Sequence, residues 1–148
     1  MAKRKFSFKD INISSGDVKA NISFKRFEQQ FQKAQFELDS AVMTDMVPYM
    51  PRVTGTFINL TKARSSAIAG TGEVVAAAPP YGRFLYEGKV MVDPKTGSPW
   101  ARKGAKKTVT NREIRYSNPK ATAKWFDTAR KNHSDEWVKL VKKHAGGD

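Results

Sequence analysis

The sequence predicts an α+β fold in which a long N-terminal helix and a C-terminal helix pack on one face of a small antiparallel β-sheet. Two apolar stripes with helical spacing predict the helices, one from Phe24 to Met46 and the other from Trp125 to His144. Short apolar segments bounded by glycine and proline lie between them and predict the strands. Because 148 residues is the usual length of one domain, we expect an N-terminal arm at residues 1–23 and a single domain at residues 24–148.

The arm has a pattern of its own. Phe6 and Phe8, and then Ile11 and Ile13, alternate with other residues, with a phase slip at Asp10. This alternation predicts an edge strand or an extended arm rather than a core strand. The polar run at residues 14–17 ends the pattern, and the sequence assigns the arm no role.

The first long helix should end near two prolines. Pro48 and Pro51 lack a backbone donor and disfavour helical geometry in the residue before each of them. After them, Thr54 is placed to cap a short helix that carries Phe57 and Leu60. The last helix starts at Trp125, and Ser134 could cap a second segment if the helix breaks near residue 132.

Three segments are predicted to form the sheet: residues 66–70, 73–78 and 112–117. The first two flank a glycine-bearing turn, and Pro79 and Pro80 end the second because proline cannot donate to a strand ladder. Gly82 and Gly88 bracket the sequence RFLYE, which we expect to be a turn or one short helical piece.

Residues 89–112 contain prolines, glycines and many cations but no sustained periodicity, which predicts a long basic loop. Eight Lys and Arg residues against two acidic ones between Lys89 and Arg115 supply nearly half of the net charge of +13. The loop is either a solvated excursion or a flexible arm that faces DNA or an acidic partner, with Trp100 as an apolar anchor. We expect it to be poorly ordered in the free subunit, and we expect substitution of its cations to leave the fold unchanged. The cations that would meet the partner are Lys89, Lys95, Arg102, Lys103, Lys106 and Lys107.

The sequence offers little for catalysis. The chain has no cysteine, which excludes thiolate chemistry and disulfides, and it has no metal-ligand motif. His133 and His144 are the only imidazoles, and since spacing implies no carboxylate partner for either, we interpret both as surface residues. We expect no enzymatic activity and no cofactor.

The N-terminal region lacks an apolar core of signal-peptide length, and no run in the sequence approaches the ~20 apolar residues of a membrane span. We therefore expect a protein that is made and assembled in a cytosol, without a membrane partner.

Three motifs occur in order along the chain: PRVTGTF with Pro51, Thr54, Gly55 and Phe57; PPYGRFLYEGK with Tyr81, Phe84 and Gly88; and KWFDTA with Trp125 and Ala129. With the elements between them, these motifs resemble the minor capsid, or tail-completion, proteins of long-tailed bacteriophages. The resemblance covers about residues 24–141. Two details differ from the family pattern: the acidic residue of the second motif is shifted to Glu87, and the third motif lacks its prolines.

The resemblance implies a structural virion protein that forms a ring of six or twelve copies in the phage neck, assembled in the host cytoplasm. Such a ring lies between the head-closure ring and the tail-terminator ring or tail tube, and it joins the DNA-filled head to the tail. Its subunits would contact each other and the neighbouring rings, and could meet lumen DNA without sequence specificity. Candidate contact residues are Phe57, Tyr81, Phe84 and Tyr86, although these four could instead belong to the core, Phe84 above all.

Two other classes remain open at this stage. The charge of +13 also fits a stand-alone nucleic-acid-binding protein, which would shift duplex DNA with a steep dependence on salt. An enzyme would require activity that is lost on changing His133 or His144.

Overall fold

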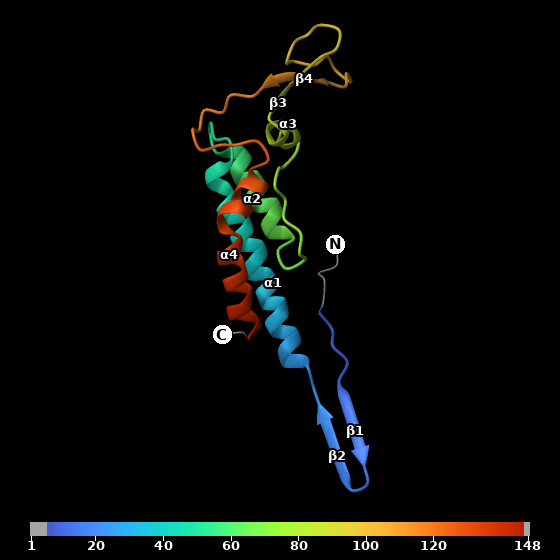
Figure 1. Ribbon diagram of the computed structural model, residues 1–148. Coiled ribbons are helices and arrows are strands. Elements are labelled where there is room, and N and C mark those ends of the chain that lie inside the picture. The colour runs from blue at the N-terminus through green and yellow to red at the C-terminus, as the bar shows by residue number, and fades with distance from the viewer. Residues whose placement is uncertain (1–5, 147–148) are drawn as a thin grey trace.

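The structure is a computed structural model that describes residues 6–146. It is a mixed α+β protein, as the sequence predicted, with four α-helices, one short 3-10 helix and two separate two-stranded antiparallel sheets in the described residues. The helices form an elongated body; one hairpin extends from the end where α1 begins, and the other lies at the opposite end (Figure 1). The elements in chain order are β1 (Ile11–Ser15), β2 (Val18–Ile22), α1 (Lys25–Met46), η1 (Val47–Tyr49), α2 (Thr56–Ala67), α3 (Gly82–Glu87), β3 (Lys89–Val92), β4 (Thr108–Glu113) and α4 (Trp125–Ala145).

The two long helices are confirmed. Helix α1 ends at Met46, where Pro48 lies in the 3-10 turn η1 that follows. Helix α4 is one continuous helix, so the suggested break near residue 132 is wrong, and Ser134 lies inside the helix rather than at a cap. The continuity follows from the absence of glycine and proline between Trp125 and Ala145. Gly146, with a φ of +89°, ends the helix.

The core lies where the C-terminal half of α1 meets the N-terminal half of α4. Met46, Met50 and Trp125 have no exposed surface, and Val42, Met43, Ile58, Ala129 and Trp137 complete the buried cluster. The Trp125 ring is contacted edge-on by Phe57, at a centroid distance of 5.9 Å, and by Tyr86, at 4.8 Å. Its indole N–H donates to the carbonyl oxygen of Ala76 at 2.8 Å. One side chain therefore joins α4 to α2, to α3 and to the segment between them.

The predicted three-stranded sheet is wrong. Within the described residues, the segment from Ile68 to Pro80 contains no strand. Side chains of the helices replace a partner strand there. The buried Asp39 carboxylate of α1 accepts the N–H groups of Gly70 and Gly72, at 2.7 and 3.1 Å. Thr61 and Ser65 of α2 do the same, accepting the N–H groups of Ala78 and Val75, both at 3.2 Å. A buried backbone donor needs a partner, but the partner need not be another strand.

The third predicted strand lies earlier in the chain than residues 112–117, because β4 spans Thr108–Glu113. Strand β4 ends at Glu113, ahead of Tyr116, whose hydroxyl instead donates to the carbonyl oxygen of Leu85 at 2.6 Å. Its partner is β3, which begins directly after Gly88, so the two strands form a hairpin with an irregularity between Lys89 and Met91. The two ends of the expected loop, residues 89–92 and 108–112, are therefore strands, and residues 93–107 connect them as a long hairpin tip.

The short helices agree better with expectation. Helix α2 carries Phe57 and Leu60 as predicted, but its N-cap residue is Gly55, with a φ of +86°, and the Thr54 hydroxyl accepts only a long bond from the Thr56 N–H at 3.4 Å. Helix α3 is the short helical piece expected between Gly82 and Gly88.

Gly88 provides a test of how α3 joins β3. Its φ is +69°, and a Cβ at this position would lie 2.5 Å from the Cβ of Ala123. Gly88→Ala should lower the free energy of unfolding by about 2–4 kcal/mol, because overpacking adds to the cost of a left-handed alanine. Gly97→Ala is the matched control, since Gly97 has a φ of +67° but no atom within 4 Å of the added methyl group. Equal losses for the two variants in urea unfolding would show that the contact with Ala123 is unimportant.

Candidate interaction surfaces

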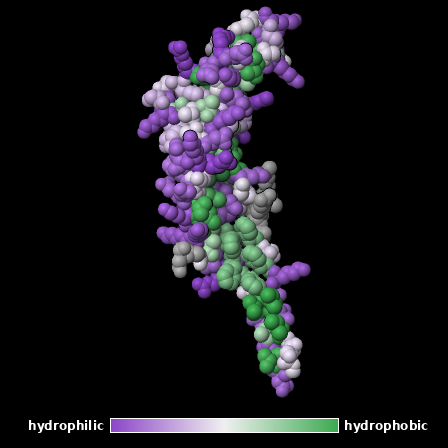
Figure 2. All heavy atoms as spheres, in the orientation of Figure 1, coloured by the Kyte–Doolittle hydropathy of each residue, from purple (hydrophilic) through white to green (hydrophobic). Residues whose placement is uncertain are grey.

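The hairpin of β1 and β2 presents an exposed apolar face. Its register pairs Ile11 with Ile22, Ile13 with Ala20 and Ser15 with Val18, and residues directly opposite each other in an antiparallel pair share a face. The side chains on this face are therefore apolar except for that of Ser15. Ile13 is 54% exposed and Val18 is 69% exposed. In Figure 2 hydrophobic residues gather on this hairpin, which extends beyond the helical body. From here on, the arm means only β1, β2 and their connection, and not the whole of residues 1–23. We call this surface its apolar face.

The other face of the arm is polar. It carries Asn12, Ser14, Lys19 and Asn21, and the Asn21 side chain donates to that of Asn12 at 2.6 Å across the strands. The strand predicted from the alternation of Phe6 to Ile13 corresponds only in part to β1, which spans Ile11–Ser15, and β2 was not predicted. The alternation of Val18, Ala20 and Ile22 after Gly16 was the signal that could have revealed it.

Two hydrogen bonds fix the base of the arm against α1. The backbone N–H of Phe8 donates to the Glu28 carboxylate at 2.7 Å, and that of Phe24 donates to the Asp10 carboxylate at 3.0 Å. The Phe8 ring lies between the rings of Phe24 and Phe31, at centroid distances of 6.3 and 5.7 Å. The arm therefore leaves the body in a defined direction.

A groove between α1 and α4 is the second apolar surface. It encloses about 490 Å³. Its lining includes Val42 and the stacked rings of Phe126 and Trp137, whose centroids lie 6.4 Å apart. Leu38, Val138 and Val141 also line it. Val138 remains 53% exposed in this groove.

Of the five aromatic residues predicted as contacts, Phe84 is half-buried but lies outside the main core cluster, and the other four fall into two groups. Phe57 and Tyr86 are half-buried against Trp125 and belong to the core region. Burial, followed by the charges of Asp127 and Glu87, raises the pKa of Tyr86. Tyr81 and Trp100 are 68% and 86% exposed and lie at the start of α3 and in the tip of the β3–β4 hairpin. These two residues remain available to a partner.

The predicted basic residues are not equivalent. The Lys89 ammonium pairs with the Glu113 carboxylate across the hairpin at 3.3 Å, and the Lys107 ammonium lies 5.3 Å from the centre of the half-buried Phe84 ring. Lys95, Lys103 and Lys106 are exposed and form no ion pair with any residue in the described part of the chain. Only these three of the six predicted cations are free to meet another molecule.

Arg102 has a structural role that the sequence analysis missed. Its guanidinium donates to both oxygens of the fully buried Asp93 carboxylate, through Nε at 2.8 Å and Nη2 at 3.2 Å. The same carboxylate accepts the backbone N–H groups of Lys95 and Arg102, at 2.8 and 3.2 Å. The Arg102 side chain, and then these backbone donors, hold the pKa of Asp93 well below its ordinary range. The expectation that changing Arg102 would leave the fold untouched is therefore wrong.

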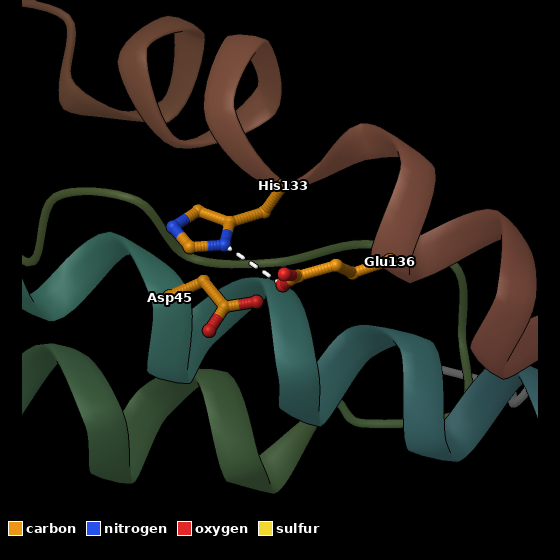
Figure 3. Close-up of side chains that lie close together, drawn as sticks. All are labelled: Asp45, His133 and Glu136. Atoms are coloured by element: carbon orange, nitrogen blue, oxygen red, sulfur yellow. Dashed lines mark hydrogen bonds and ion pairs between the residues drawn. The ribbon is translucent and has the colours of Figure 1, made fainter.

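The structure also brings together three side chains that no sequence motif connects. Asp45 extends from the last turn of α1 toward His133 and Glu136, which lie one turn apart on α4 (Figure 3). His133 Nδ1 lies 3.0 Å from the Glu136 carboxylate, so this histidine does have a carboxylate partner, contrary to expectation. A His-x-x-Glu spacing on a helix was the available signal, but sequence alone could not place Asp45 beside it.

Asp93 gives the hairpin tip a predictable dependence on pH. Its folded-state pKa lies below the ordinary value of 3.8, so its stabilisation is complete above that value and is lost as the pH falls through the lower folded-state pKa. In ¹H–¹⁵N spectra the amides of Lys95 and Arg102 should keep their native shifts down to pH 3.8. Asp93→Asn should lose those shifts at every pH, because it cannot form the charged pair with Arg102. A midpoint at the ordinary carboxyl value would contradict the pairing.

Comparisons with family models, with curated proteins and with solved structures give no match to this chain. Within residues 6–146, no helix is both long and apolar enough to cross a membrane.

Proposed function

We propose that this chain is a structural virion protein that forms a ring in the neck of a long-tailed phage and joins the DNA-filled head to the tail. The observation that carries the assembly part of the proposal is the apolar face of the arm. A two-stranded hairpin is only marginally stable in water by itself, and this one exposes isoleucine and valine side chains where the body of the same chain does not reach. Such a face favours a partner that covers it.

A second copy of the chain is the occupant that we assign to this face. The arm projects from one end of the body, whereas the groove between α1 and α4 lies on the body itself. A contact between two different patches of identical subunits is heterologous, and it closes into a ring when the rotation between neighbours divides a full turn. The arm of one copy in the groove of the next would produce such a series, with six or twelve copies for a phage neck.

The phage part of the proposal rests on the resemblance, and the geometry of its motifs supports it. Phe57 of the first motif contacts Trp125 of the third, and Tyr86, which lies inside the second segment but is not one of its matched positions, contacts the same ring. The segments that carry the three motifs thus meet at one buried side chain, which supports a common fold for them.

In the neck, the neighbouring partners would be the head-closure ring on one side and the tail-terminator ring or tail tube on the other. The β3–β4 hairpin lies at the end of the body opposite the arm (Figure 1) and presents Trp100, Lys95, Lys103 and Lys106. This end would meet an acidic neighbouring ring or the DNA in the lumen.

The alternative is a stand-alone nucleic-acid-binding protein, favoured by the same exposed cations. The two functions differ in the role of the arm, which a DNA binder does not require. A DNA binder should also shift duplex at near-physiological salt with a steep salt slope, whereas a neck subunit should bind DNA weakly.

The arm provides the first test. Ile13→Ser combined with Val18→Ser should convert the assembled protein to monomer in size-exclusion chromatography with light scattering, because the variant loses the two most exposed large apolar side chains of the face. The matched control is Asn12→Ser combined with Ser14→Ala on the opposite face of the same strand, which should leave the oligomer intact. A wild-type chain that remains monomeric at high concentration, or a control that dissociates equally, would contradict self-association through this face.

The free cations provide the second test. Changing Lys95, Lys103 and Lys106 together to Ser should leave thermal stability nearly unchanged, because none of the three has an ion-pair partner in the described structure. In a phage that carries the variant gene, we expect DNA-filled heads and separate tails in electron micrographs. Infectious particles at wild-type yield would show that the tip of the hairpin is a solvated surface.

A further inference from the structure

We propose that Asp45, His133 and Glu136 form a binding site for a divalent transition-metal ion, with Zn²⁺ as the ion that fits best. The site joins the last turn of α1 to the middle of α4 (Figure 3). This inference is independent of the proposed function and rests on geometry alone.

The donor atoms are already close to one another. One oxygen of each carboxylate and one nitrogen of the imidazole all lie within 4.8 Å of each other. His133 Nδ1 and Glu136 Oε2 are 3.0 Å apart. Two ligands that each lie about 2.1 Å from one ion are separated by about 3.0–3.5 Å, so this pair already has a suitable spacing. No spacing between the three donor atoms exceeds 4.8 Å, so each pair is at most ~1.3 Å wider than that range.

The atoms of His133 and Asp45 that would not bind the ion are held by neighbours. One oxygen of Asp45, Oδ2, accepts the indole N–H of Trp137 at 2.7 Å, which leaves Oδ1 available. The far nitrogen of His133, Nε2, lies 3.4 Å from the Tyr49 hydroxyl. That hydroxyl oxygen accepts the Asn132 amide at 3.0 Å. A metal-bound imidazole needs an acceptor for its second N–H, and such contacts orient the ring and set its tautomer.

The charge around the site favours a cation. The chain has 27 Lys and Arg residues against 14 acidic ones, yet in the described structure no Lys or Arg forms an ion pair with Asp45 or Glu136. The two carboxylates therefore lie within 4.8 Å of each other and of the imidazole without an ion-paired Lys or Arg in the described residues. A divalent ion would neutralise both charges at once.

The ligand types select the class of metal. One imidazole with two carboxylates suits zinc and its first-row neighbours better than magnesium or calcium, which prefer sites made only of oxygen atoms. The Glu136 side chain is 72% exposed, so water can complete the coordination. Bound metal would cross-link α1 and α4 close to the point where Pro48 ends α1.

Titration of the whole chain with ZnCl₂ in metal-free, phosphate-free buffer tests the proposal. Calorimetry should give one site per chain. His133→Ala and Glu136→Gln should each weaken binding about 10-fold or more, because removing even a residue that only orients a metal ligand typically costs about 10- to 100-fold in affinity. The matched controls are His144→Ala, the other histidine of α4, and Asp135→Asn, the neighbour of Glu136; both should bind zinc like the wild type. MgCl₂ should bind far more weakly than ZnCl₂.

A second readout reports on the site directly. Zinc should change the tryptophan emission, because the Trp137 indole donates to a ligand carboxylate, and it should raise the melting temperature by mass action. Trp137→Phe should abolish most of the emission change. Because Glu136 is largely exposed, Glu136→Gln tests the site even if His133→Ala fails to fold. The proposal is overturned by a chain that binds no zinc at millimolar concentration, by controls that weaken binding as much as the site variants, or by magnesium binding as tightly as zinc.

Discussion

The buried indole of Trp125 is the interaction on which the rest of the body depends. It lies at the first position of α4 with no exposed surface, and its two edge-on aromatic contacts come from α2 and α3. Its N–H satisfies the carbonyl oxygen of Ala76, in a segment that has no strand partner. Edge-to-face pairs add about 0.5–1.5 kcal/mol each beyond the apolar area that they bury. Because one ring joins four segments, their positions relative to α1 depend on each other.

The helices could be predicted from the sequence, and the sheet could not. Periodicity located α1 and α4 because each has one apolar stripe over more than 20 residues. Residues 68–78 resemble strands because their apolar composition fits a ladder, but Asp39 replaces the ladder from a position 31 residues before Gly70. Local patterns carry no information about such a distant acceptor. For the same reason, the sequence could not show that Asp45 and Glu136, which lie on different helices, are close together.

The cations of residues 89–112 have different roles, which composition alone could not distinguish. Composition shows that residues 89–112 are basic, but it gives no reason to distinguish one cation from another. In the structure, Arg102 and Asp93 organise the tip, Lys89 pairs with Glu113 within the hairpin, and Lys107 lies over the Phe84 ring of α3. The exposed tryptophan and lysine side chains lie on a hairpin tip that the pair of Asp93 and Arg102 holds in place. The predicted site residues Trp100, Lys95, Lys103 and Lys106 therefore stay candidates for a partner contact, whereas Phe57 and Tyr86 have a packing role.

The two hydrogen bonds at the base of the arm have a consequence for assembly. Glu28 and Asp10 accept the backbone N–H groups of Phe8 and Phe24, and so set the angle between the arm and α1. In an arm-to-groove assembly, that angle determines the curvature of the polymer. A small change in it leaves every contact intact but prevents the last copy from meeting the first, and the product is then an open helical filament instead of a ring. In such an assembly, the two surface carboxylates would therefore help to determine the diameter of the ring.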